Sequence, residues 1–147
     1  MSAALRQLVQ RLDLRDRVHF LGPIEPEHLR EAYSAADVFV LATSYEGWAN
    51  VFLEAMACAL PVVTTQVGGN DEVVNTKELG ILVPLGDQRA LTAALGRALE
   101  QDWDREHIRA YAQRNSWDER VATLTAEFTA VVPPLTANRE GTGALVG

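Results

Sequence analysis

Short runs of consecutive apolar residues alternate with helical repeats along this chain. Four of these runs precede a turn signal, and we expect them to be strands: Val18–Leu21, Val38–Ala42, Pro61–Thr64 and Gly80–Pro84. The run from Val38 has no polar alternation, as expected of a parallel strand that is covered on both faces. Strands separated by helices imply right-handed crossovers, so the sequence predicts an α/β fold with a doubly wound parallel sheet of about four strands.

The intervening segments carry apolar stripes at helical spacing. Asp87 and the Ser116/Glu119 pair stand where helix caps are expected. The predicted helices cover Leu5–Leu12, Pro26–Ala36, Asn50–Leu60, Asp87–Leu99, Asp104–Arg114 and Ser116–Val131. Pro133 and Pro134 end the last helix, so we expect one Rossmann-like domain over residues 1–132 and a disordered tail over 133–147.

Composition excludes several classes of function. The chain has 147 residues, 48% of them hydrophobic, and a net charge of −7 with no cluster of Lys and Arg, which argues against a nucleic-acid partner. Its single cysteine, Cys58, can form no intrachain disulfide. No segment reaches the ~20 apolar residues of a membrane helix. We therefore expect a soluble, cytoplasmic protein, with docking on a membrane surface left open.

Two carboxylates flank one predicted strand-to-helix turn. Glu46 lies in the loop after the second strand, and Glu54 lies about one turn into an otherwise apolar helix. We expect both to face one crevice, because ligands of such folds bind beyond the carboxyl ends of the strands. A carboxylate on a helix that is buried all round needs hydrogen-bond donors, and a ribose diol would supply two.

Simpler interpretations of both acids exist. Glu54 could complement the dipole of its own helix, and Glu46 could be a solvated loop residue. Their spacing favours a shared site. Gly47 permits close backbone approach, and the free N–H groups near Asn50 and Val51 would bind a diphosphate.

The segment from Glu46 to Val63, followed by Val67-Gly68-Gly69 and Glu72, resembles the donor-site signature of glycosyltransferase family four, whose members have the GT-B fold. The similarity runs from about Arg17 to Val131. It implies a retaining glycosyltransferase, hexosyl or related, that uses a nucleoside-diphosphate sugar such as a UDP-sugar or GDP-sugar. It implies no cofactor and no metal, and the sequence offers no convincing ligand cluster.

The resemblance also implies a role for each site residue. Glu46 would be the catalytic-site residue that contacts hydroxyls of the transferred sugar, and Glu54 would bind the nucleotide ribose. The remaining donor-binding residues would be Gly47, Trp48, Ala49, Asn50 and Val51 at the sugar and diphosphate, and Pro23 and Ile24 near the base.

The sequence departs from the family pattern in three ways. Ala59 replaces a frequent glycine at a helix end, and Ala49 replaces a usual glycine or proline. The acceptor domain and the basic residues that neutralise the diphosphate are expected before Arg17 and are not in this sequence. We therefore expect weak donor binding and little transfer by this chain alone. We also expect self-association, as a homo-oligomer or by domain swapping, to cover exposed apolar surface.

Two other functions compete with the transferase. The first is a non-catalytic nucleotide-binding or interaction module on the same fold. The second is a sugar-nucleotide epimerase, which the closely spaced pair of glutamates disfavours.

Overall fold

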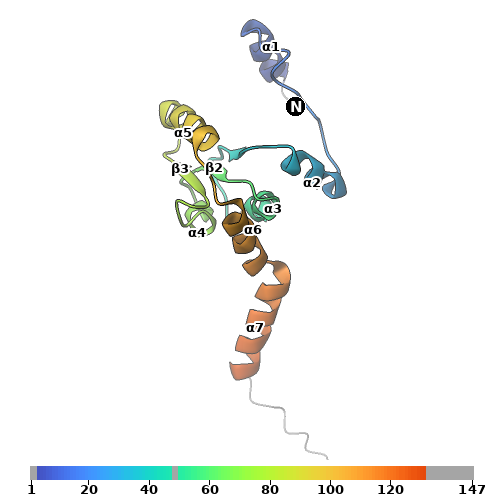
Figure 1. Cartoon of the computed structure of the whole chain (residues 1–147), viewed down its shortest axis with the longest axis vertical. Coiled ribbons are helices and arrows are strands. Elements are labelled where there is room, and N and C mark those ends of the chain that lie inside the picture. Colours follow the sequence, from blue (N-terminus) through green and yellow to red (C-terminus); the bar gives the residue numbers. More distant parts are fainter. Residues whose placement is uncertain (1–2, 48–49, 132–147) are drawn as a thin grey trace, which may run out of the picture.

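The computed structural model describes residues 3–47 and 50–131 as helices, strands and connecting segments (Figure 1). In chain order the elements are α1 (Ala3–Arg11), α2 (Pro26–Ser34), β1 (Phe39–Leu41), α3 (Asn50–Ala57), β2 (Val62–Thr65), α4 (Asn70–Val73), β3 (Gly80–Val83), α5 (Gln88–Glu100), α6 (Arg105–Arg114) and α7 (Trp117–Val131). The predicted tail, 133–147, lies outside the described residues.

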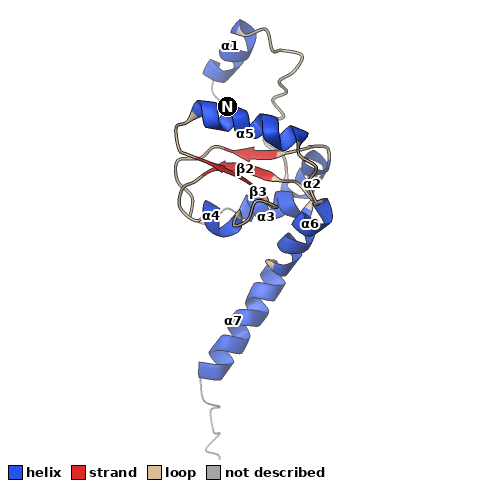
Figure 2. Cartoon of the chain, turned by 60° about the vertical axis from the view of Figure 1, so that its left-hand side comes forward, coloured by secondary structure: helices blue, strands red, loops and turns tan. Residues whose placement is uncertain are grey.

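The centre of the fold is a parallel sheet in the order β1-β2-β3. Val62 of β2 is aligned with Phe39 of β1 on one side and with Gly80 of β3 on the other. Figure 2 shows α5 on one face of this sheet and α3, α4 and α6 on the other. The α/β class with a parallel sheet, predicted from the alternating runs, is confirmed.

The buried core lies between the sheet and the helices on its two faces. Every residue of β2 is buried, as expected for the central strand of a sheet covered on both sides. Phe52 and Met56 of α3 and Ile108 of α6 are fully buried. This packing fixes α3, the helix that carries Glu54, against both β2 and α6.

The prediction of a strand at Val18–Leu21 was wrong. The described part of the chain has three strands, and none of them includes this segment. A strand requires a neighbour for its N–H and C=O groups, and no residue among those described pairs with this segment. The Phe20 ring instead lies under the guanidinium of Arg6, 4.7 Å from its carbon. Phe20 therefore contacts α1 rather than the sheet, while Leu21 of the same run is exposed.

The end of α3 has an unusual backbone conformation. Ala59 has φ of +64°, the left-handed conformation that ends many helices and that glycine adopts with less strain. The helix consequently stops at Ala57, earlier than the predicted end at Leu60. Arg105 donates a hydrogen bond to the Ala59 carbonyl over 3.1 Å, which ties the turn to α6.

Helices α1 and α7 extend away from the sheet in opposite directions (Figure 1). Neither helix has a buried residue. In α7 the exposed apolar side chains are Trp117, Val121, Leu124, Phe128 and Val131. Both ends of the described chain thus leave apolar surface in contact with solvent.

Candidate functional site

The carboxyl ends of all three strands meet at one cavity of about 290 Å³. Its lining residues follow β1, β2 and β3 and begin α5: Ala42, Thr65, Val83, Pro84, Leu85, Gly86, Asp87, Gln88 and Leu91. The predicted cap of α5 is confirmed, since the Asp87 side chain accepts a hydrogen bond from the Ala90 N–H. Parallel sheets bind ligands beyond the carboxyl ends of their strands, and the loops after Ala42, Thr65 and Val83 converge there.

Glu46 is positioned through its main chain. The Gly69 N–H donates a hydrogen bond to the Glu46 carbonyl over 3.3 Å. Gly68 has φ of +51°, and a Cβ on it would lie 1.7 Å from that same carbonyl oxygen. The turn after β2 therefore needs glycine at position 68, because the Glu46 loop approaches it closely. In this arrangement Glu46 is half-buried.

A buried polar network supports this turn. The Asn70 amide donates to the Thr64 hydroxyl at 3.1 Å and to the Thr65 carbonyl at 2.9 Å. The hydroxyls of Thr64 and Thr65 donate in turn to the carbonyls of Leu41 and Thr43. The network joins the ends of β1 and β2 to α4, directly beneath Gly68 and Gly69.

Asn70 was missed by the sequence analysis. Its side chain is fully buried, and its Oδ1 has no hydrogen-bond partner among the described residues. A buried polar atom left unpaired costs about 1–3 kcal/mol. The sequence signal was present, since an asparagine directly after two glycines is typical of a turn that begins a helix.

Glu54 is exposed, which corrects the expectation of a helix that is buried all round. Asn50, Glu54 and Ala57 are exposed on α3, while Phe52, Ala55 and Met56 are buried. Counting apolar residues along the sequence does not reveal that α3 has an exposed face, because this face is only one residue wide per turn. The penalty for burying a charge therefore does not apply to Glu54.

Tyr33 of α2 contacts Glu54. Its hydroxyl donates a hydrogen bond to Glu54 Oε2 at 3.3 Å. The Tyr33 ring packs edge to face on Phe39, which packs in the same way on Phe52. Burial raises the pKa of the Tyr33 phenol, and the Glu54 carboxylate raises this pKa further through its charge and as hydrogen-bond acceptor.

Glu54 also lines a second cavity, of about 280 Å³, between α3 and the start of α7. The other lining residues are Asn50, Leu53, Ala57, Ala112, Asn115, Ser116, Trp117 and Arg120. Glu46 lines neither this cavity nor the one at the strand ends. The common crevice for the two acids stays a prediction, because Trp48 and Ala49, which lie between them, are outside the described residues.

The other predicted site residues are spread over two regions. Gly47 and Asn50 are exposed and Val51 is half-buried at the start of α3. Pro23 is exposed and Ile24 is half-buried in the segment before α2, and neither lines the two cavities.

Within residues 3–47 and 50–131, no group of three or more His, Cys, Asp and Glu side chains is placed to hold a metal ion. No helix in that part of the chain is both long and apolar enough to cross a bilayer.

Comparison with known proteins identifies relatives over most of the chain. The D-inositol 3-phosphate glycosyltransferase of Geodermatophilus obscurus is 37% identical over 137 residues, which cover 90% of this chain and 30% of that relative. The N-acetyl-alpha-D-glucosaminyl L-malate synthase of Bacillus anthracis is 35% identical over 108 residues, 74% of this chain and 27% of the relative. The chain thus spans less than a third of the length of either protein.

Solved structures show the same fold. Sucrose-phosphate synthase from Thermosynechococcus elongatus superposes with a TM-score of 0.68 at 34% identity, over 87% of this chain and 34% of the other. The Anabaena protein Alr3699/HepE, in complex with UDP, gives 0.70 at 25% identity, over 88% and 36%. A family model described as glycosyl transferases group 1 matches residues 1–101. The chain therefore belongs to the group 1 family of glycosyl transferases.

Proposed function

We propose that this chain is the donor-binding portion of a retaining glycosyltransferase that uses a UDP-sugar or a GDP-sugar. The observation that carries the proposal is the arrangement of two glutamates around one strand-to-helix connection at the carboxyl end of the sheet. The main chain of Glu46 is held by Gly68 and Gly69, and the exposed Glu54 carboxylate opens to solvent one turn into α3. The UDP bound to the HepE relative supports a nucleotide ligand.

Each acid has a distinct role in this proposal. Glu54 accepts hydrogen bonds from the two ribose hydroxyls, for which an ionised carboxylate is the stronger kind of acceptor. Glu46 accepts from hydroxyls of the transferred sugar. The N–H groups at the start of α3, near Asn50 and Val51, face the diphosphate, where the positive end of the helix dipole favours an anion. Pro23 and Ile24 lie by the base.

Transfer needs more than this chain offers. A departing diphosphate requires fixed positive charge, and no basic residue lines the cavity at the strand ends. We propose that a preceding acceptor domain supplies that charge, as the relatives of more than three times this length suggest. The chain alone then binds donor and transfers little, and it works in the cytoplasm, where a single unpaired cysteine is ordinary.

We also propose that the isolated chain self-associates through α7. Its exposed apolar residues, Trp117, Val121, Leu124, Phe128 and Val131, recur at steps of four and three, the spacing at which two helices pack along a seam. In a longer protein the acceptor domain is the expected partner of this face.

The test of donor binding is a calorimetric titration of UDP and GDP into the chain. We expect one nucleotide to bind, and Glu54→Gln to weaken binding by about tenfold, the loss expected for a hydrogen bond to a charged group. Glu100→Gln, at the exposed end of α5, is the matched control and should leave the Kd unchanged. Equal binding by the Glu54 variant would overturn the ribose assignment.

A further inference from the structure

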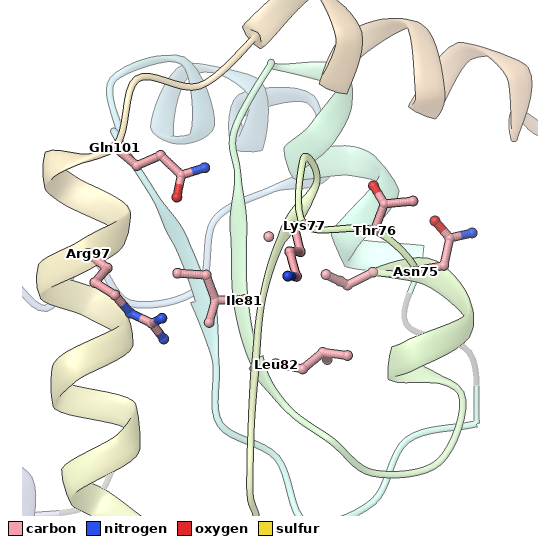
Figure 3. Close-up of a pocket in the computed structure, with 9 residues that line it drawn as sticks. Asn75, Thr76, Lys77, Ile81, Leu82, Arg97 and Gln101 are labelled. Carbon is pink, nitrogen blue, oxygen red and sulfur yellow. The ribbon is translucent and has the colours of Figure 1, made fainter.

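A cavity of about 480 Å³ lies beside β3 (Figure 3), and neither Glu46 nor Glu54 lines it. It is bounded by the segment after α4, by β3 itself and by the last turn of α5. The lining residues are Val74, Asn75, Thr76, Lys77, Gly80, Ile81, Leu82, Arg97 and Gln101. None of them belongs to the proposed donor site.

One edge of β3 has unused main-chain groups. The Val62 N–H donates to the Leu79 carbonyl and the Gln66 N–H donates to the Val83 carbonyl, so odd-numbered residues of this segment face β2. By alternation, the N–H and C=O groups of Gly80 and Leu82 face away from β2, and both residues line the cavity, Gly80 as a buried residue and Leu82 as a half-buried one. No strand in the described part of the chain pairs with this edge.

The charge around this edge is opposite in sign to that of the whole chain. The net charge is −7, yet the cavity is lined by two cations, Lys77 and Arg97, and by no carboxylate. Figure 3 shows these two side chains on either side of Ile81. Glu78, the nearest acid in sequence, is not a lining residue; a hydrogen bond from Thr76 lowers the pKa of its carboxyl.

We propose that this edge binds an extended, acidic peptide segment of a partner protein, which adds a fourth strand beside β3. The outward donors and acceptors of Gly80 and Leu82 would form the main-chain ladder, and carboxylates of the peptide would pair with Lys77 and Arg97. Addition of a strand to an open sheet edge is a recurring mode of peptide recognition, with main-chain bonds giving affinity and side chains giving selectivity.

Two other occupants fit less well. A small anion would satisfy the cations but would leave the outward carbonyls of Gly80 and Leu82 without donors. A second copy paired edge to edge would bring Lys77 and Arg97 close to the same two cations of the other copy, and like charges opposed across a sheet are destabilising. An acidic strand alone satisfies both the main-chain groups and the charges.

The test uses a short dye-labelled peptide that alternates valine with glutamate, followed by fluorescence anisotropy. We expect the full chain to bind this peptide with an affinity that falls as salt rises. Arg97→Gln and Lys77→Gln should each weaken binding by about three- to tenfold, the range of a charge-assisted contact. Arg89→Gln, on the same helix but outside the cavity, is the matched control and should bind like the unaltered chain.

Two altered peptides test the geometry without disturbing the protein. Replacing glutamate by lysine should abolish binding. Methylating the backbone nitrogens that face β3 should also abolish it, because the ladder then loses its donors. Equal binding of the methylated peptide, or its complete displacement by inorganic phosphate, would show a simple anion site and overturn the proposal.

Discussion

The carbonyl oxygen of Glu46 lies so close to Gly68 that a methyl group at position 68 would stand 1.7 Å from it. These residues belong to separate loops, one after β1 and one after β2. Their contact is the means by which the sheet positions the loop that precedes α3. Any side chain at position 68 must therefore move Glu46.

Gly68→Ala tests this dependence. The left-handed φ of Gly68 and the overlap with Glu46 predict a loss of stability of about 1–3 kcal/mol. Calorimetry of the variant should also show donor binding weakened by about tenfold or more, as displaced site geometry does. Gly96→Ala in α5, where an added methyl meets nothing within 4 Å, is the control and should raise stability by about 1 kcal/mol. Unchanged donor affinity in the Gly68 variant would show that the Glu46 loop takes no part in binding.

The contact between Tyr33 and Glu54 predicts a late phenol titration. Because the pKa of Tyr33 is raised in the folded chain, the unfolded chain loses this proton first, and stability falls as pH rises above the ordinary tyrosine value of about 10. Near-ultraviolet absorbance should show that Glu54→Gln lowers the Tyr33 pKa. Tyr111, whose pKa burial raises, should titrate as before and serves as the internal control. A Tyr33 titration indifferent to Glu54 would contradict the contact.

Ala59→Gly should leave the chain equally stable or stabilise it by up to about 1 kcal/mol, because glycine relieves the left-handed backbone strain while adding chain entropy. Thermal unfolding followed by circular dichroism measures the difference. Ala93→Gly, at an exposed position inside α5, should instead cost about 1 kcal/mol. Equal losses in the two variants would show that Ala59 is unstrained.

Self-association through α7 should depend on the apolar seam. Leu124→Glu places a charge on the seam and should give a monomer in light scattering at concentrations where the unaltered chain associates. Ala126→Glu places the same charge on the opposite side of α7 and should leave association intact. A monomeric unaltered chain at high concentration would contradict the expectation.

The alternation of strands and helices could be predicted because continuous apolar runs and amphipathic stripes are local signals. The failure at Val18–Leu21 is physical: the sequence shows that a segment suits a strand but not that a neighbouring strand exists to pair with it. The exposure of the Glu54 side chain could not be predicted from the sequence for a similar reason. Apolar residues dominate α3 in linear order, and only the packing of α3 on β2 and α6 shows which face stays open.

The support beneath the site was the least predictable part. The pairing of Asn70 with Thr64 and Thr65 depends on the turn that brings α4 back onto the end of β2. Likewise, the need for glycine at position 68 comes from a loop more than twenty residues earlier in the chain. The sequence analysis singled out Gly68 but not Asn70, and it could not supply the contacts that explain either residue.

If Glu46 and Glu54 contact one bound nucleotide sugar, amide NMR of the labelled chain during titration with that ligand will detect both contacts at once. We expect the amides of Glu46, Gly47, Asn50, Val51 and Glu54 to shift together with a single Kd. We also expect UDP or GDP alone to shift the α3 residues more than Glu46. Shifts confined to one of the two glutamates, or to the cavity around Lys77 and Arg97, would show that the two glutamates do not share a donor site.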